Sequence, residues 1–383
     1  MAAAQGLFLT NNVLFVAVNG LVGLSLAPHN WMATLPIMGY VIGGAASTGP
    51  VAWTQARWGR KVSFQIGLVV AFFSVLLATF AVLNASFWLL VTATVIAGYY
   101  SANGQLYRFA AAELAKPEYR ERAVSMVLAG GIIGGVVGPN LAKWTQHWGT
   151  VPFAGAYATL AVVALIAMGV VSQVQFPPVP PKKKGADGGR PLSVIMRQPV
   201  FIVCTAAAAV GYGVMNILMS ASPIAMQVCG HPFKDAALVL EWHVIGMFAP
   251  GFFTGHLIKR FGAIAIMSVG VALNVLSIVI ALAGVDVMYF LLSMFLVGVG
   301  WNFLFTAGTA LSLTAYRPEE KDKAQGAINF CVFALMMISA FSSGALVTTN
   351  GWTLLNYVSL IPVGLMAFAV LWYVLQGRRP QAV

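Results

Sequence analysis

Two pairs of side chains in the second half of the chain have the types and spacing of a soft-metal site. Met215 and Met219 lie four residues apart in one apolar segment, and His243 and Met247 lie four residues apart in the next. Residues at i and i+4 share one face of a helix. Thioethers and imidazole favour Cu(I) and exclude hard cations. The pattern predicts a Cu(I) site if the two segments are neighbouring helices.

The connection between the two segments adds three further soft or borderline ligands, Met226, Cys229 and His231. We expect these three to handle a metal ion as it enters. The alternative for the methionines is packing, because an i, i+4 methionine pair in an apolar helix is ordinarily a core feature. A histidine inside a membrane span needs partners for its ring nitrogens, and this favours a functional role for His243.

Composition shows which elements must carry these residues. The chain of 383 residues is 60% hydrophobic and 8% charged, with a mean hydropathy of +0.85. This excludes a soluble globular domain and predicts an all-α membrane protein. At about 20 residues per span, the length accommodates about twelve transmembrane helices. We place them at 7–28, 31–54, 62–83, 86–112, 122–146, 152–174, 199–222, 236–258, 263–284, 287–314, 324–348 and 352–376.

A break divides these spans into two sets of six. Residues 175–198 are rich in proline, then lysine, then glycine, which is typical of a solvated linker. The sequence therefore predicts a six-helix bundle over residues 1–174, a cytoplasmic linker over 175–198, and a second six-helix bundle over 199–383. The segments that hold Met215 and His243 become the seventh and eighth spans, antiparallel neighbours with the two pairs at similar depth.

Basic residues predict the orientation in the membrane. With the N-terminus inside, 19 of the 21 lysines and arginines fall at cytoplasmic ends, and Lys143 and Lys234 alone fall outside. We therefore expect a multi-pass protein of the bacterial inner membrane with both termini in the cytoplasm. The net charge of +11 is explained by topology and contact with anionic lipid, and predicts no binding of nucleic acid.

The two halves also repeat a short basic motif. Arg57-x-Gly59 and Arg260-x-Gly262 are offset by 203 residues, about half of the chain. Around the first copy, Gly49 and the run Gly59-Arg60-Lys61 resemble the signature cytoplasmic loop of the major facilitator superfamily, although its usual acidic position is Ala56 here. The resemblance implies two pseudo-symmetric six-helix bundles around a central cavity. It also implies a gating role for Arg57, Gly59, Arg60 and Lys61, with Glu113, Glu118 and Glu121 as candidate partners.

The two ligand pairs carry a narrower resemblance. Met-x3-Met on the seventh helix and His-x3-Met on the eighth, within residues 215–262, are similar to the motifs of the CcoA-type copper importers, a branch of this superfamily. The resemblance implies import of copper, as Cu(I), across the inner membrane for respiratory oxidase assembly. It assigns the metal to Met215, Met219, His243 and Met247. Copper is the transported substrate, and no cofactor is expected.

Two other transport functions stay open. A related branch imports riboflavin, and a flat organic nutrient would need aromatic and amide side chains in the cavity. Those available are Tyr99, Tyr100, Asn103, Asn216, Trp301 and Asn302. A drug/proton antiporter is favoured by the glycine-rich run Gly130–Pro139, which resembles the fifth-helix motif of such proteins. It is disfavoured because their fourth-helix arginine is absent at Tyr100–Gly104 and no carboxylate lies deep in the first half.

An enzyme is not expected, because no Ser/His/Asp set, phosphate-binding loop or pair of carboxylates occurs. The expected partners are the copper ion and the lipid bilayer, and we expect the protein to be a monomer.

Overall fold

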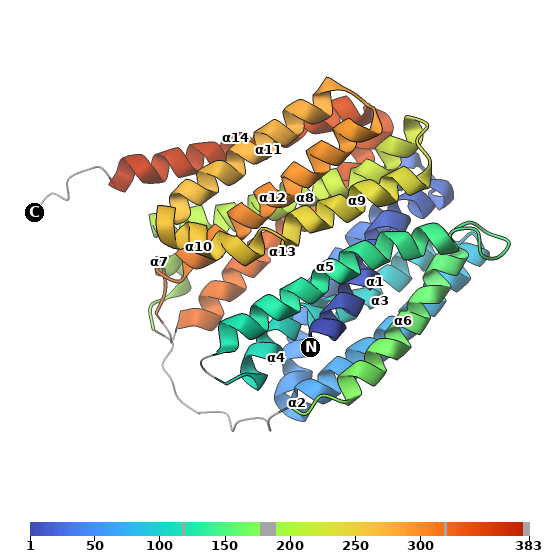
Figure 1. Ribbon diagram of the computed structural model, residues 1–383, viewed down its shortest axis with the longest axis horizontal. Helices are drawn as coiled ribbons and strands as arrows, with labels where there is room; N and C mark the ends of the chain where they lie inside the picture. The colour runs from blue at the N-terminus through green and yellow to red at the C-terminus, as the bar shows by residue number, and fades with distance from the viewer. Residues whose placement is uncertain (117–118, 177–188, 318–319, 378–383) are drawn as a thin grey trace, which may run out of the picture.

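The computed structural model describes residues 1–116, 119–176, 189–317 and 320–377, and within these ranges it contains helices and no strand. The helices form two groups that lie side by side (Figure 1), called here the N-terminal group (α1–α6) and the C-terminal group (α8–α14). The elements are α1 (Ala2–Leu26), η1 (Asn30–Met32), α2 (Leu35–Leu83), α3 (Phe87–Gly104), α4 (Tyr107–Leu114), α5 (Arg120–Thr145), α6 (Ala154–Ser172), α7 (Leu192–Met196), α8 (Pro199–Val228), α9 (Phe233–Phe248), α10 (Gly251–Phe261), α11 (Ala263–Ala283), α12 (Val287–Ser312), α13 (Lys321–Thr349) and α14 (Gly351–Gly377).

The expected all-α architecture of twelve spans is confirmed. In the described part of the chain, eight helices are long and apolar enough to cross a membrane, and the bent pair α9–α10 makes a ninth. The long helix α2 holds two of the expected spans, because its backbone leaves the helical conformation at Gly59. The remaining two positions are occupied by α3 with α4 and by α5. The division into bundles at 174 and 199 stays a prediction, since residues 177–188 lie outside the described residues.

The repeated basic motif has the same backbone conformation in both groups. Gly59 has φ 84° and ψ 168°, and Gly262, 203 residues later, has φ 85° and ψ 155°. Side chains other than hydrogen disfavour positive φ, so glycine is the residue that allows this turn. In the N-terminal group the turn separates the two spans within α2, and in the C-terminal group it separates α10 from α11.

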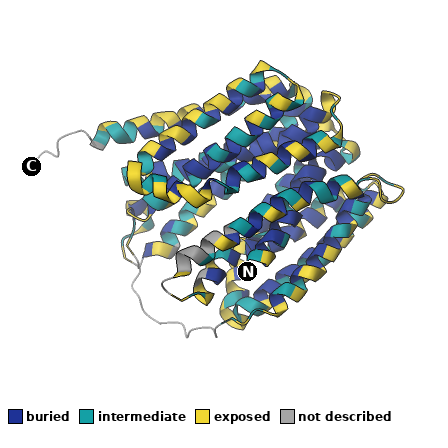
Figure 2. Cartoon of the chain, in the orientation of Figure 1, coloured by how far each residue is buried: buried dark blue, intermediate teal, exposed yellow. Residues whose placement is uncertain are grey.

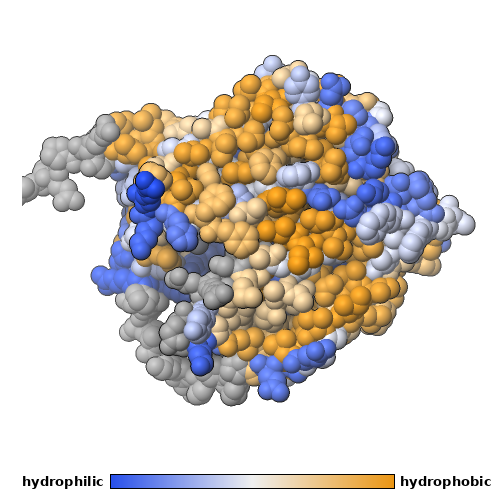
Figure 3. All heavy atoms as spheres, viewed as in Figure 1, coloured by the Kyte–Doolittle hydropathy of each residue, from blue (hydrophilic) through white to orange (hydrophobic). Residues whose placement is uncertain are grey.

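The surface matches a membrane protein. Figure 3 shows apolar side chains across the middle of the molecule and hydrophilic ones gathered toward its two ends. Figure 2 shows exposed residues along the outward faces of α6, α11 and α14, while α1 and α8 are largely buried. We call the end that carries Arg57, Arg60, Lys61, Lys259 and Arg260 the basic end, which lies to the left in Figure 1, and the opposite end the far end.

Glycines bring α5 into backbone contact with α1. A Cβ at Gly134 would collide with the carbonyl oxygen of Gly6, and one at Gly138 would lie 2.8 Å from the carbonyl oxygen of Thr10. The same stretch meets the other group, because a Cβ at Gly135 would collide with the side chain of Val244 in α9. Small residues allow this close approach of helices in lipid. The glycine-rich run of α5 is therefore explained by packing, without antiport.

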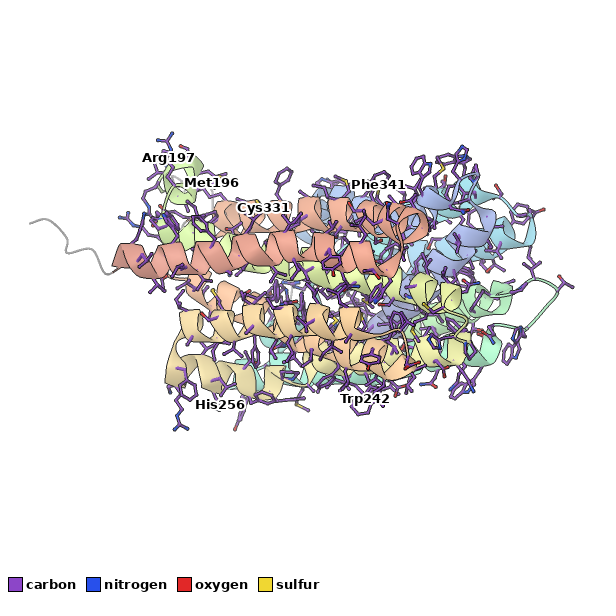
Figure 4. All side chains as sticks on the ribbon, turned by 90° about the horizontal axis from the view of Figure 1, so that it is seen from above. Met196, Arg197, Trp242, His256, Cys331 and Phe341 are labelled. Carbon is purple, nitrogen blue, oxygen red and sulfur yellow. The ribbon has the colours of Figure 1, made fainter. Side chains whose placement is uncertain are left out.

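The two groups are hydrogen-bonded to each other toward the far end. The hydroxyl of Thr34 donates to the carbonyl of Ala340 in α13 (2.6 Å) and accepts from the backbone N–H of Gly344 (3.0 Å). The amide of Asn140 in α5 donates to the carboxylate of Glu241 in α9 (2.9 Å). Three side-chain hydrogen bonds thus join the two groups toward this end. In Figure 4, Phe341 of α13 is well separated along the molecule from Arg197, which lies near the basic end. The structure is therefore a conformation closed at the far end.

The chain is fixed to the C-terminal group soon after the linker. Arg190 donates from its backbone N–H and from Nε to one carboxylate oxygen of Glu320 (2.7 and 2.9 Å), and from Nη2 to the other (2.7 Å). These hydrogen bonds hold the pKa of the buried Glu320 carboxyl well below its usual range. Gln198 and Arg190 also both donate to the carbonyl of Ala315, near the end of α12. The short helix α7 between them therefore belongs with the C-terminal group.

Candidate substrate site between the two helix groups

An aromatic cluster lies where α8, α9 and α12 meet in the C-terminal group. Trp301 and Phe305, one helical turn apart on α12, are stacked with ring centroids 5.3 Å apart. Tyr212 of α8 meets both rings edge-on, with centroids 5.1 and 5.0 Å away. Phe248 of α9 adds a third neighbour to Trp301 at 6.0 Å. Four rings in this arrangement provide a surface on which a flat aromatic molecule can pack.

Two nitrogen donors beside this cluster are buried and unused. In the described part of the chain, Nε1 of Trp301 and Nε of Arg108 have no hydrogen-bond partner in the protein. Arg108 lies on α4 in the N-terminal group and interacts electrostatically with Tyr212 across the boundary between the groups. A buried polar group without a partner is unfavourable. These donors are therefore available to a bound molecule.

Phe248 connects the cluster to the N-terminal group. It packs against the main hydrophobic core and also against a second core of the N-terminal group that includes Phe8, Tyr100 and Tyr107. The aromatic cluster therefore reaches the boundary between the groups and is not confined to the interior of one of them.

The N-terminal group carries a set of polar side chains around Tyr40. The hydroxyl of Tyr40 in α2 points toward the side chains of Asn11 and Asn12 in α1 and Ser101 in α3. None of these is placed well enough to form a hydrogen bond with it. Asn12 and Ser101 are each partly exposed. The N-terminal group thus offers hydroxyl and amide groups, and the C-terminal group offers aromatic rings.

The amides that the sequence suggested for an organic substrate are mostly used within the protein. Asn103 accepts a hydrogen bond from Ser63 (3.0 Å). Asn216 donates to a carbonyl and a hydroxyl of α13, and Asn302 donates to the backbone of α9. These three residues join helices to one another. From that set of six, Trp301 has a buried donor, Nε1, that has no partner in the protein.

The two expected metal-binding pairs lie in the protein interior. Met215, Met219 and Met247 belong to the main hydrophobic core, with 4%, 6% and 7% of their surface exposed. His243 is fully buried, and its Nδ1 lies 2.7 Å from the carbonyl oxygen of Met294 in α12. That nitrogen therefore joins α9 to α12, while Nε2 has no protein partner. In the described residues, no group of three or more His, Cys, Asp or Glu side chains is arranged to hold a metal.

The three residues expected at a metal entry point are not alike in the structure. Met226 is fully buried in α8, whereas Cys229 is exposed in the loop that follows. Nε2 of His231 lies 2.7 Å from the carbonyl oxygen of Val285, and its ring contacts Phe290 edge-on. His231 therefore joins two far-end loops, and Met226 packs in the core.

The basic loop expected to act in gating makes specific contacts. Nε of Arg60 donates to Glu113 at the end of α4 (2.6 Å), and the two form an ion pair. Lys61 donates to the carbonyl of Ser172 at the end of α6 (2.6 Å). Glu113 was among the expected partners; Glu118 and the side chain of Glu121 lie outside the described residues. Because Arg60 and Glu113 belong to the same helix group, their ion pair does not itself join the two groups. The gating role stays a prediction.

Sequence patterns did not single out Arg108, Tyr212 or Phe248 as site residues. Arg108 was expected only as a residue of a cytoplasmic helix end, whereas in the structure its Nε is buried without a partner and it interacts electrostatically with Tyr212. The sequence signal was that Arg108 directly follows an apolar span and that no acidic residue precedes Glu113 in the chain.

Comparison with known proteins agrees with this architecture. A family model described as Major Facilitator Superfamily matches residues 1–250 and 235–383. The riboflavin transporter RfnT of Brucella anthropi is 37% identical over 362 residues, which cover 94% of this chain and 90% of that protein. The uncharacterized transporter YddS of Bacillus subtilis is 26% identical over 377 residues, which cover 94% of this chain and 86% of that protein.

Solved structures with the same fold include a D-xylose–proton symporter, with a TM-score of 0.76, 15% identity, and coverage of 97% of this chain and 95% of that chain. The nucleoside transporter NupG is also similar, with a TM-score of 0.72, 13% identity, and coverage of 98% of this chain and 99% of that chain. At these identities the likeness concerns the fold alone.

The copper hypothesis drawn from the sequence is wrong. A relative that aligns along nearly the whole chain is a riboflavin transporter, whereas the resemblance to copper importers rested on residues 215–262. The structure gives a physical reason why the motif misled: i, i+4 spacing places Met215 with Met219 on one helix face, and that face is part of the packed core. Copper import is therefore not the function of this protein.

The packing role of the methionines can be tested by changing the volume of the side chain at position 215. Replacing Met215 by Leu conserves volume and polarity, and we expect a small change in stability, below about 1.5 kcal/mol. Replacing it by Ala leaves a cavity and should destabilise the protein by about 2–5 kcal/mol. Thermal unfolding of the purified variants in detergent measures both effects. A Met215→Leu variant that unfolds as easily as Met215→Ala would contradict a packing role.

The ion pair at the basic end gives a second prediction. Arg60→Ala should reduce the rate of substrate uptake by more than it reduces the amount of folded protein, because a surface ion pair contributes about 0–1 kcal/mol to stability. The reversed pair Arg60→Glu with Glu113→Arg should recover part of the uptake that either single variant loses. Equal losses of uptake and of folded protein, without recovery in the double variant, would instead indicate a purely structural contact.

Proposed function

The chain belongs to the Major Facilitator Superfamily, and from this premise we propose that it imports riboflavin by alternating access. The observation that carries the proposal is its 37% identity to a riboflavin transporter along 94% of its own length. Import of riboflavin or another small organic nutrient was one of the two alternatives that the sequence left open.

The boundary between the helix groups supports a substrate of this chemistry. Riboflavin combines a flat three-ring system, whose edge has carbonyl acceptors and one N–H donor, with a chain of hydroxyl groups. Trp301, Phe305 and Tyr212 offer ring surfaces for the flat part. The unused donors of Trp301 and Arg108 match carbonyl acceptors. Asn12, Ser101 and their neighbours around Tyr40 suit the hydroxyl chain. Ligand sites of this kind are largely apolar with a few convergent polar groups.

The direct test is uptake of labelled riboflavin by cells that cannot make it and lack another importer. Trp301→Ala should raise the KM for uptake about tenfold, because an aromatic pair contributes up to about 1.5 kcal/mol. Trp301→Phe, which keeps a ring but loses Nε1–H, should have a smaller effect. Trp144→Ala removes a tryptophan that is 64% exposed and serves as the matched control. Uptake no greater than in cells without the protein would overturn the proposal.

Competition identifies the part of the molecule that is recognised. Lumichrome, which keeps a flat three-ring system without the hydroxyl chain, should inhibit uptake in the parent more strongly than in Trp301→Ala. Ribitol, which resembles the hydroxyl chain alone, should inhibit weakly in both.

We also propose that the protein lies in a bacterial inner membrane with its basic end and both termini in the cytoplasm. The support is the distribution of lysine and arginine, which places 19 of 21 on that side. Under this orientation the described conformation, with its far end closed, faces inward.

Cys229 provides a test of orientation. It is exposed in the far-end loop, whereas Cys204 is buried and Cys331 is half-buried in α13. A maleimide that does not cross membranes should label Cys229 in intact cells. Partial burial raises the pKa of the Cys229 thiol, so labelling should be faster at about pH 8.5 than at neutral pH, because the thiolate reacts. The label should be absent in Cys229→Ser. Labelling that appears only after the membrane is broken would reverse the orientation.

A further inference from the structure

A basic residue near the turn within α2 lies over one of two exposed tryptophans that contact each other. The guanidinium carbon of Arg57 is 5.7 Å from the ring centre of Trp53. Trp53 and Trp58 meet edge-on with centroids 5.1 Å apart. Trp53 and Trp58 are 55% and 47% exposed. Large aromatic surface is thus left outside the protein next to a positive charge.

The neighbouring basic residues Arg60 and Lys61 bind to other groups of the protein, whereas Arg57 contacts an exposed aromatic ring. Arg60 pairs with Glu113, and Lys61 donates to the carbonyl of Ser172. The guanidinium of Arg57 lies over the ring of Trp53. The sequence contains no acidic residue before Glu113, and Glu113 is occupied by Arg60. The charge of Arg57 is therefore directed outward.

The C-terminal group repeats this arrangement at the equivalent position. The guanidinium carbon of Arg260 is 5.2 Å from the ring centre of Phe261, directly before the turn at Gly262. Both residues are exposed, as are Phe252 and Phe253 on the preceding turns of α10. Residues 251–262 include no acidic side chain. Figure 4 shows His256, one turn before Arg260, at the periphery of the molecule.

We propose that these two places are headgroup sites for anionic phospholipids of the leaflet at the basic end, one per helix group. Arg57 binds the lipid phosphate, and the indole N–H groups of Trp53 and Trp58 donate to phosphate or ester oxygens. The rings themselves lie at the boundary of headgroups and acyl chains, where tryptophan is favoured. In the second site Arg260 binds the phosphate and Phe261, Phe252 and Phe253 contact acyl chain.

Charge and position identify a lipid as the occupant. Guanidinium groups bind phosphate oxygens in a fixed fork geometry, and a basic residue near an anionic leaflet is attracted to it. The aromatic side chains beside each arginine are exposed, and hydrophilic side chains at the basic end adjoin the apolar middle of the molecule (Figure 3). Because phenylalanine lacks a donor, the first site should bind more tightly than the second. This proposal depends on the membrane orientation and not on riboflavin as the substrate.

Native mass spectrometry of the purified full chain tests the proposal. The protein is titrated with phosphatidylglycerol or with phosphatidylcholine of the same acyl chains. The parent should retain two phosphatidylglycerol molecules more tightly than any phosphatidylcholine. Arg57→Ala should weaken the tighter binding step about fivefold, the effect of one basic residue at an anionic surface. Arg57→Ala with Arg260→Ala should remove the preference for the anionic lipid.

Two controls separate this effect from general changes. Lys234→Ala removes an exposed charge at the far end and should leave the titration unchanged. Trp53→Ala, which keeps the charge, should weaken the same step as Arg57→Ala. Thermal unfolding of each variant in lipid-free detergent should match the parent, since the altered side chains are exposed.

Three results would overturn the proposal. One is equal binding of phosphatidylglycerol by the parent and the double variant. Another is equal binding of the two lipids by the parent. The third is a dimer that the Arg57 and Trp53 variants dissociate, because the surface would then be an interface between copies of the chain.

Discussion

A polar group inside a bilayer must find its partner within the protein, and this constraint shapes the structure. The hydrocarbon offers no hydrogen bonds, so each backbone amide is satisfied within a helix. Polar side chains in the spans face the same requirement. Asn216 and Asn302 meet it by donating to the backbone of a neighbouring helix, and His243 meets it at Nδ1 but not at Nε2. These contacts position α8, α9, α12 and α13 relative to one another, and the same rule makes the exceptions informative. The donors of Trp301 and Arg108 are buried without partners, next to rings at the boundary between the groups.

Much of the fold could be predicted from the sequence because the signals are long and repeated. Twelve apolar runs and a basic break in the middle predict the helices and their division into groups. The turns at Gly59 and Gly262 were visible as a repeat, and each glycine adopts the positive φ that explains its presence. The exact helix contacts could not be predicted in this way. A glycine such as Gly134 signals close approach, but only the structure shows that its neighbour is Gly6.

The site was harder to predict because residue spacing does not say which way a helix face points. Met215 and Met219 do share a face, as their spacing requires, and that face packs into the core. A short motif also covers few residues, so whole-chain similarity to a riboflavin transporter outweighs it. Arg108 was missed for a different reason. Basic residues near the end of a span are ordinarily topology signals, and a rule that treats them all in this way does not distinguish one whose Nε is buried without a partner.

The small number of side-chain hydrogen bonds identified across the far end is consistent with a transporter that must open there. Thr34 and Asn140 make the side-chain hydrogen bonds across the far end that the described residues contain. A typical hydrogen bond contributes a net of about 0.5–1.5 kcal/mol, so three of them stabilise the closed far end by only a few kcal/mol. A substrate can shift such an equilibrium only by binding the two conformations with different affinity. A site with rings on one helix group and hydroxyls and amides on the other satisfies this condition. A substrate makes all of its contacts only in the conformation that brings both sets of side chains within reach of it.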